Sequence, residues 1–538
     1  MLLTTLTIGA QSFENATTAV ANMKVGWNLG NTLDACSNGT QGLESETYWG
    51  QPYTKPELMK MMKEAGFGAI RVPVTWYNHM NGNQVNSEWM KRVHEVVDYV
   101  LNQGMYCIIN VHHDTGSGSQ WLHASMDVYN NQKARYEALW QQIATEFKDY
   151  GEKLLFESYN EMLDKYNSWC FASFNASGRY NATDAADAYQ AINSFAQSFV
   201  STVRATGGNN AQRNLIVNTY GACCGEGNWN AHLLDPLKEM KYPNDPAGAG
   251  HIAFQVHTYP NINDLNSAKN SITQMFKDLN TYLVAKGGPV IIGEWATSNV
   301  DADVPDYERD RAKYLEFIDF FVKEAKKKGL GMFYWMGISD GSSRTLPAFN
   351  QPDLAETMMK AFYGSSDGFK FPTREDFGDS YFQVTYSDQW GELNLIPNAI
   401  KTADYKQLEV ELAEKPASGQ FSLKVYPTQK YQSITSEKST LVFNTSTHGQ
   451  SITQITLQAS AAGYKTSVKS VQLVKKDGTK TACTVYPFWG CSVEEIFTGI
   501  RPIVVPFADD QYYDLSGRRV RNPQRGIYIR NGKKILVK

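Results

Sequence analysis

The residues best suited to chemistry are polar side chains at the ends of short apolar runs. Two of them are glutamates: Glu161 ends the segment LLFESYNE (154–161), and Glu294 lies near the end of PVIIGEWA (289–296). A carboxylate beside an apolar run costs desolvation free energy unless another group pairs it or the protein uses it. Paired carboxylates are what cleavage of a glycosidic bond requires, one as proton donor and the other as nucleophile or as the base that activates water.

Further polar side chains and one tryptophan lie in or just after the apolar runs. They are Asn31 and Asp34 after 24–30, Arg71 in 69–76, His112 and His113 in 106–114, Asn160 beside Glu161, His257 and Tyr259 in 252–260, and Trp335 in 331–337. A fold that brings the ends of these runs together therefore gathers all of these residues into one site.

The elements that must position them alternate between apolar and amphipathic segments from residue 24 to residue 364. Most of the apolar segments are nearly continuous runs rich in Ile and Val, which is typical of parallel strands covered by helices. The eight segments are 24–30, 69–76, 106–114, 154–161, 214–221, 252–260, 289–296 and 331–337. They predict a (β/α)8 TIM barrel. An open doubly wound sheet is the alternative, but the first strand lacks a glycine-rich phosphate fingerprint followed by a helix.

A barrel places its active site at the carboxyl ends of its strands. The fourth and seventh strands lie roughly opposite each other, so we expect Glu161 and Glu294 to face one another. A separation of about 5–5.5 Å indicates a covalent intermediate with retention, and about 6.5–9.5 Å indicates inversion. Among the helices between the strands, Thr54 with Glu57 predicts a capping box, and Gly66 predicts the end of that helix.

Seven motifs in this region resemble glycoside hydrolase family 5, the large cellulase family, in the family's order and on the expected strands. They are GWNLGNTLD (26–34), RVPVTW (71–76), INVHHD (109–114), Asn160-Glu161, HTYP (257–260), IGEW (292–295) and YW (334–335). The resemblance covers residues 24 to about 364. It implies a retaining double displacement without a metal or other cofactor. One departure is Met162, which stands where the family usually has proline.

The resemblance also implies a role for each site residue. Glu161 is the expected acid/base and Glu294 the expected nucleophile. The other residues are expected to bind substrate or to orient the nucleophile: Asn160 at the sugar 2-hydroxyl, Arg71 and Tyr259 on Glu294, His112 and His257 in the inner polar shell, Trp335 under the central sugar, and Asn31, Asp34 and His113 at its neighbour.

Several of these residues have other interpretations. Glu157 lies about 13 Å before Glu161 along the strand and is expected to be an ionic partner of Arg71. A metal site made by the segment 112–114 with His257 and Asp340 is disfavoured, because adjacent strand residues point to opposite faces. Exposed-loop tryptophans that either stack further sugars or pack in the core are Trp121, Trp169 and Trp229.

The pattern changes after Gly364. We expect a β-sandwich module over 375–497, because segments of period two are broken by Gly, Pro, Asn and Asp. This module either binds carbohydrate or acts as a spacer. A basic stretch follows, and DLSGRR with GIYI within 507–538 resembles the C-terminal sorting tail of secreted Bacteroidota proteins. The expected domains are thus a signal-like segment over 1–10, the catalytic barrel over 20–364, the module and the tail.

Composition limits the possible partners. The 51 Lys and Arg nearly balance the 55 Asp and Glu, which gives a net charge of −4 and argues against nucleic acid. No stretch approaches the ~18–20 apolar residues of a membrane span. The odd number of cysteines, seven, predicts at least one free thiol or a partner outside the chain. The apolar start MLLTTLTIGA resembles part of a secretory signal.

The sequence therefore predicts a secreted endo-β-1,4-glucanase that acts as a monomer on plant cell-wall polysaccharide, secreted by or attached to the surface of a Gram-negative bacterium. The alternatives within the same fold are a xyloglucanase, a mixed-linkage glucanase or a mannanase. A catalytically inactive glycan-binding protein is the alternative of a different class.

Overall fold

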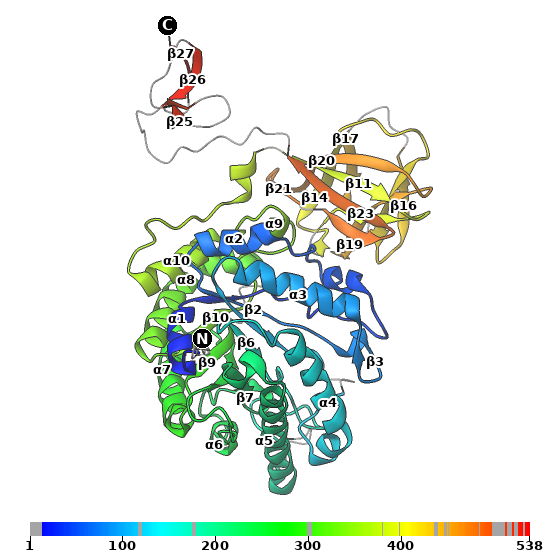
Figure 1. Ribbon diagram of the computed structural model, residues 1–538. Helices are drawn as coiled ribbons and strands as arrows, with labels where there is room; N and C mark the ends of the chain where they lie inside the picture. The colour runs from blue at the N-terminus through cyan, green and yellow to red at the C-terminus, as the bar shows by residue number, and fades with distance from the viewer. Residues whose placement is uncertain are drawn as a thin grey trace, which may run out of the picture. The chain divides into compact units, whose positions relative to one another are not determined.

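The computed structural model of the chain (Figure 1) contains two compact units, residues 1–373 and 374–538. The residues that the structure describes are 13–116, 121–174, 179–297, 304–378, 380–396, 399–434, 440–445, 449, 451–483, 485–497, 512–513, 519–520, 526–530 and 533–537. The signal-like segment 1–10 lies outside them, and so does much of the basic tail.

Eight parallel strands close into a barrel in the first unit, in the order β1-β10-β9-β8-β7-β6-β5-β2. The barrel is closed because β1 pairs with both β2 and β10. The strands are β1 (Gly26–Asn28), β2 (Ala69–Val72), β5 (Tyr106–Asn110), β6 (Leu154–Glu157), β7 (Leu215–Asn218), β8 (Ile252–Thr258), β9 (Val290–Trp295) and β10 (Gly331–Tyr334). The predicted TIM barrel is confirmed.

Helices connect the strands and surround the barrel (Figure 1). They are α1 (Ala16–Met23), α2 (Pro56–Glu64), α3 (Ser87–Leu101), α4 (Met126–Glu146), α5 (Ala182–Ala205), α6 (Asp235–Glu239), α7 (Leu265–Tyr282), α8 (Val304–Lys327), α9 (Ser342–Thr345) and α10 (Pro352–Tyr363). A short hairpin of β3 (Met80–Asn81) and β4 (Gln84–Val85) precedes α3.

The starts of α3 and α2 are stabilised differently. In α3 the Asn86 side chain accepts the Glu88 N–H at 2.8 Å and caps the helix. The capping box predicted for α2 is wrong, because this helix begins at Pro56 after Lys55 without a side-chain cap. The N–H of Thr54 instead donates to the Glu46 carboxylate at 2.7 Å.

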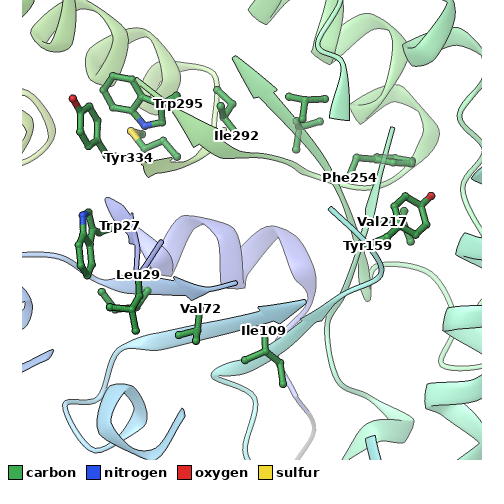
Figure 2. Packing of buried hydrophobic residues seen from close by; sticks show 14 of the residues in the cluster. Trp27, Leu29, Val72, Ile109, Tyr159, Val217, Phe254, Ile292, Trp295 and Tyr334 are labelled. Atoms are coloured by element: carbon green, nitrogen blue, oxygen red, sulfur yellow. The ribbon is translucent and has the colours of Figure 1, made fainter. Parts of the chain in front are cut away.

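The outward faces of the barrel strands pack against the helices (Figure 2). Figure 2 shows these side chains arranged around the strands: Trp27, Leu29, Val72, Ile109, Val217, Phe254, Ile292, Trp295 and Tyr334, with Tyr159 just after β6. All of them are fully buried. Burial of apolar area contributes roughly 25 cal/mol per Å² removed from water, so this shell of buried side chains stabilises the barrel.

The interior of the barrel is divided into an apolar end and a polar end. The apolar end is closed by α1, whose Ala16, Ala19, Val20 and Met23 form one buried cluster with strand residues. The strand members are Ala69, Tyr106, Ile108, Leu155, Ile216, Ala253, Ile291 and Phe333. Two residues further along, the inward positions of five strands, β2 and β5 to β8, are polar: Arg71, Asn110, Glu157, Asn218 and Gln255. Period-two alternation thus places the polar side chains at the carboxyl ends of the strands, where a barrel has its site.

The second unit is a β-sandwich followed by a small sheet. One sheet has the order β17-β14-β20-β11-β23 with β21 beside β20, the other has the order β16-β15-β19-β12-β22, and a short pair is β13-β18. The first sheet comprises β11 (Ser380–Tyr386), β14 (Tyr405–Leu412), β17 (Thr440–Asn444), β20 (Lys465–Lys475), β21 (Lys480–Ala482) and β23 (Cys491–Phe497). The second comprises β12 (Glu392–Asn394), β15 (Phe421–Tyr426), β16 (Lys430–Ser433), β19 (Gln454–Ala459) and β22 (Tyr486–Trp489). The pair is β13 (Ile400–Lys401) and β18 (Ser451–Ile452).

Both sheets of the sandwich contribute leucine, isoleucine, valine and phenylalanine to one buried core. Towards the C-terminus the chain forms a four-stranded antiparallel sheet of β24 (Tyr512–Tyr513), β25 (Arg519–Val520), β26 (Gly526–Arg530) and β27 (Lys533–Val537). Among the described helices, none is long and apolar enough to cross a membrane. All seven cysteines are free thiols.

Candidate active site

Arg71 of β2 lies at the centre of the polar end of the barrel and is fully buried. Its five N–H groups each meet an acceptor. Nε and Nη2 donate to Glu157 at 2.7 and 2.8 Å, and Nη2 also donates to the Asn160 side-chain oxygen at 2.8 Å. Nη1 donates to Glu294 at 2.7 Å and to Asn28 at 3.0 Å. The guanidinium is therefore satisfied in every direction and fixes both carboxylates in place.

Glu294 of β9 accepts hydrogen bonds at both carboxylate oxygens. Arg71 bonds Oε1 at 2.7 Å, and the Tyr259 hydroxyl donates to Oε2 at 2.6 Å. Nδ1 of His257 lies 3.6 Å from Oε2. Burial alone raises the pKa of Glu294, but the neighbouring His257 and Arg71 and the two hydrogen bonds outweigh it and hold this pKa below its ordinary value. Glu294 is thus kept ionised.

Glu161 lies just beyond β6 and has the opposite environment. Its side chain is 22% exposed, against 5% for Glu294, and its Oε1 is hydrogen-bonded to Nδ1 of His257 at 2.8 Å. Burial and the negative charge of Glu294 raise the pKa of Glu161, although the His257 bond opposes them. An oxygen of Glu161, an oxygen of Glu294 and a ring nitrogen of His257 all lie within 4.8 Å of one another. The two glutamates therefore meet across the mouth, one favouring the protonated form and one the ionised form.

His112 and Trp335 form one wall of the site. The His112 ring lies parallel to the Trp335 indole, with centroids 6.1 Å apart and an interplanar angle of 5°. Asn110 contacts Nδ1 of His112 at 3.0 Å, and Nε2 lies 4.0 Å from Glu294. Burial, more than neighbouring cations, holds the pKa of His112 well below its usual value, so this ring is neutral. Gly30 allows the indole to approach, since a Cβ there would lie 2.9 Å from it.

Asn31, Asp34 and His113 lie together beside this wall. Both oxygens of Asp34 accept backbone N–H groups, from Asn31 at 3.0 Å and from Thr32 at 2.8 Å. Asp34 is fully buried, and burial raises its pKa to about 6. Asn31 is partly exposed in the left-handed region at φ 60°, which asparagine tolerates. The Asp34 carboxylate therefore holds the turn that presents Asn31, and only Asn31 and His113 keep exposed surface.

The two adjacent histidines do not point to opposite faces, so that expectation is wrong. β5 ends at Asn110, and beyond the strand the alternation no longer applies. The rings of His112 and His113 are 4.5 Å apart, and both offer a nitrogen within 4.8 Å of an Asp34 oxygen. Burial lowers the pKa of His113 to about 4.

The remaining predicted residues divide into buried and exposed groups. Glu157 forms the predicted ion pair with Arg71. Trp121 packs internally, because its indole N–H donates to Asp114 at 2.6 Å and the Arg135 guanidinium lies 4.4 Å from its ring. Trp169 and Trp229 are 46% and 66% exposed and remain available to ligands. Met162, which replaces the family's proline, is fully buried in the hydrophobic core.

Sequence reasoning missed the residues that support this site from inside the barrel. Asn28 bonds Arg71, Asn218 donates to Glu157 at 3.2 Å, and Asn110 bonds His112. Trp49 was also missed: it is 39% exposed, and its ring lies 5.1 Å from that of His113. The asparagines end apolar runs at inward positions, which is the signal that identifies them once the barrel is known.

A closed barrel with two glutamates close together at its carboxyl end, one with a lowered and one with a raised pKa, is the arrangement expected of a glycoside hydrolase. The family model described as cellulase (glycosyl hydrolase family 5) matches residues 33–341. The chain belongs to glycosyl hydrolase family 5.

Individual relatives agree with this family. Endoglucanase B of Neocallimastix patriciarum is 32% identical over 389 residues, which cover 68% of this chain and 75% of that protein. Among solved structures, a GH5-4 broad-specificity endoglucanase from an uncultured bacterium is 60% identical with a TM-score of 0.64, over 66% of this chain and 98% of the other. A family 5 enzyme from Prevotella bryantii B14, solved with a xyloglucan tetradecasaccharide, is 38% identical with a TM-score of 0.58, over 65% and 99%.

Proposed function

We propose that this chain is an endo-β-1,4-glucanase that hydrolyses β-glucan by a retaining double displacement. The observation that carries the proposal is the opposite displacement of the pKa values of Glu161 and Glu294, whose oxygens lie within 4.8 Å of each other. This separation supports retention, because inversion needs about 6.5–9.5 Å between the carboxyl groups to admit a water molecule.

In the first step an oxygen of ionised Glu294 attacks the anomeric carbon. The bond from that carbon to the glycosidic oxygen breaks, its electron pair stays on the oxygen, and protonated Glu161 gives that oxygen its proton. A covalent glycosyl–enzyme results. In the second step water attacks the anomeric carbon, Glu161 takes a proton from the water, and Glu294 leaves as a carboxylate.

The neighbouring residues support both steps. Arg71 holds the side-chain oxygen of Asn160, which leaves the Asn160 amide N–H groups to donate to the sugar 2-hydroxyl. His257 contacts Glu161 and lies close to Glu294, so it orients the acid against the nucleophile. Trp335 and Asn31 line the mouth where successive sugars bind.

The substrate class in the proposal rests on the relatives. The Neocallimastix relative and the solved neighbour at 60% identity are both called endoglucanases, and that neighbour is described as broad in specificity. The Prevotella enzyme was solved with xyloglucan, so xyloglucan and mixed-linkage glucan stay within the proposal as further substrates.

Activity of a nucleophile variant tests the proposal. Glu294→Gln should lower reducing-sugar release from barley β-glucan by about 1,000-fold or more, which corresponds to ~4 kcal/mol of transition-state stabilisation. Glu64→Gln, at a surface glutamate of α2 paired with Lys60, is the matched control and should leave the rate unchanged. Substantial residual hydrolysis by Glu294→Gln rejects the nucleophile, and an inverted anomer in the first NMR spectra of the product rejects retention. Relative rates on carboxymethylcellulose, xyloglucan and mannan then rank the substrates.

The proposal includes a monomeric enzyme that is exported to the cell surface or beyond. One closed barrel carries both glutamates and their hydrogen-bond partners, so the proposed reaction needs no residue of a second copy, which favours a monomer. The apolar start and the pattern of the basic tail support export and sorting by sequence alone. Light scattering of the purified protein and fractionation of producing cells test these two points; a dimer or a cytoplasmic location rejects them.

A further inference from the structure

The sandwich sheet with the order β16-β15-β19-β12-β22 has one face that points away from the sandwich core. Strand alternation places Leu393, Leu423 and Leu457 in that core, so their neighbours face outward. The strand register aligns these outward residues in rows. Glu392 of β12 lies opposite Gln458 on β19 and opposite Trp489 on β22.

A cavity of about 610 Å³ opens on this face. Three aromatic residues line it and remain exposed: Trp390 is 51%, Trp489 53% and Tyr431 58% exposed. Glu392, Lys424 and Gln458 line the cavity between them. Flat, exposed rings around a polar centre are therefore displayed on a rigid sheet.

The two tryptophans are brought together by closely approaching loops. Trp390 precedes Gly391, and Trp489 precedes Gly490; a Cβ on Gly391 would lie 2.3 Å from the Gly490 carbonyl oxygen. Trp390 itself adopts φ 68°, in the left-handed region that a bulky side chain rarely occupies. Backbone strain of this kind is concentrated at functional sites, because the surrounding structure must stabilise it.

The polar centre of the cavity is a satisfied network. Glu392 is 5% exposed and accepts from Lys424 at 2.8 Å, Thr456 at 2.7 Å, Gln458 at 3.0 Å and Tyr426 at 2.9 Å. The carboxylate and the ammonium balance each other, so the cavity has no net charge from this pair. The contacts also fix Lys424 and Gln458, which line the cavity and therefore have little side-chain freedom to lose on binding.

We propose that this cavity is a second glycan-binding site, separate from the active site, that holds a β-glucan chain. Exposed aromatic rings stack on the apolar faces of pyranose rings, while fixed amide and ammonium groups bond the equatorial hydroxyls. A charge-balanced cavity suits a neutral polymer and gives no attraction to anionic ligands. The choice of β-glucan rests on the proposed function. A polymer that both sites hold would raise the effective concentration of substrate at the barrel.

Binding by the full-length protein tests this site independently of catalysis. In the Glu294→Gln background, affinity electrophoresis in barley β-glucan and depletion onto insoluble cellulose are measured with and without Trp390→Ala/Trp489→Ala. We expect at least a tenfold loss of retention. Tyr431→Ala, on the opposite side of the cavity, should weaken retention severalfold. Val442→Ala, an equally exposed position on β17 of the other sheet, is the matched control and should change nothing.

Two measurements make the result decisive. In the otherwise unmodified enzyme, the cavity variants should hydrolyse cellohexaose at the original rate, so a failure of the proposed hydrolysis is seen separately from a failure of polymer binding. Thermal unfolding should be unchanged, because the replaced side chains are exposed. Unaltered retention by both cavity variants overturns the proposal, and so does a protein dimer that these substitutions dissociate.

Discussion

At the residue scale, one guanidinium divides its charge between two carboxylates with different tasks. Glu157 neutralises Arg71 deep in the barrel, while Glu294 receives a single N–H and keeps its second oxygen for Tyr259. The pKa of Glu294 is therefore set by neighbours that can be removed one at a time. Glu161 shares none of these Arg71 hydrogen bonds, and burial, together with the charge of Glu294, raises its pKa against the opposing His257 hydrogen bond.

The hydroxyl of Tyr259 is the most direct test of this division. We expect Tyr259→Phe to lower kcat by about 10- to 100-fold, because a hydrogen bond to a charged group contributes roughly 1.5–3 kcal/mol. In the proposed mechanism, activity requires ionised Glu294 and is lost as the pH falls through the pKa of this residue. Removing a bond that lowers this pKa should therefore move the acidic limb of the kcat/KM profile to higher pH.

The basic limb provides the internal control for this experiment. It depends on protonated Glu161, whose hydrogen bond to His257 is untouched, and should stay in place. Tyr363→Phe removes a comparable hydroxyl, which donates to the Gly66 carbonyl outside the site, and should leave both limbs unchanged. An acidic limb that does not move in Tyr259→Phe contradicts the role given to Tyr259.

Many residues of the candidate site could be proposed from the sequence alone, and the exceptions have a physical cause. Glu161 and Glu294 stand out because a carboxylate beside an apolar run costs desolvation free energy unless another group pairs it or the protein uses it. Asn28 and Asn218 do not stand out, because a neutral amide at a strand end is unremarkable until its facing direction is known. The predicted orientation of His112 and His113 was wrong for a related reason, because the sequence does not show at which residue β5 ends.

At the element scale, the position of Trp335 depends on a contact between the first and last barrel strands. The loop after β1 brings Gly30 against the indole that follows β10, and a Cβ at this glycine would lie 2.9 Å from the ring. Trp335, which the family resemblance places under the central sugar, can therefore occupy its position only because residue 30 has no side chain.

We expect Gly30→Ala to displace the indole and to lower kcat/KM for cellohexaose by about 5- to 30-fold, since overpacking of this kind costs about 1–2 kcal/mol. Most of the loss should appear in KM, because the two glutamates are untouched. Steady-state kinetics on cellohexaose check this. Gly151→Ala, where an added Cβ meets no atom within 4 Å, is the matched control. Equal kinetics for both variants contradict the close contact.

Elements were predicted well wherever local pattern decides them. Continuous apolar runs gave all eight barrel strands, because parallel strands are covered on both faces. The predicted capping box of Thr54 with Glu57 at the start of α2 was wrong. The Thr54 N–H donates instead to Glu46, which lies eight residues earlier in the chain. Such a partner cannot be read from the residues that flank the helix.

At the scale of the whole molecule, the described residues form one main hydrophobic core in each of the two compact units. Each core draws on its own strands. Two separate cores of this size predict two unfolding transitions for one chain, because cooperativity follows shared packing.

Core substitutions distinguish the two transitions. Leu423→Ala, fully buried in the sandwich, should destabilise one transition by about 2–5 kcal/mol and leave the other unchanged. Ile109→Ala, fully buried on the outer face of the barrel strand β5, should do the reverse. Differential scanning calorimetry of the full-length protein measures both. If either substitution lowers both transitions equally, the units do not unfold independently.

The saturation of Arg71 has a consequence for how this enzyme loses activity. Its acceptors come from β1, β6, β9 and the segment after β6, so the guanidinium finds all its partners only when strands distant in the chain have met. A folding intermediate with an open barrel would leave Arg71 and the carboxylates of Glu157 and Glu294 without their ionic partners in an apolar interior. Activity should therefore be lost in the same step in which the barrel opens. Residual hydrolysis then measures the fraction of molecules whose barrel is still closed.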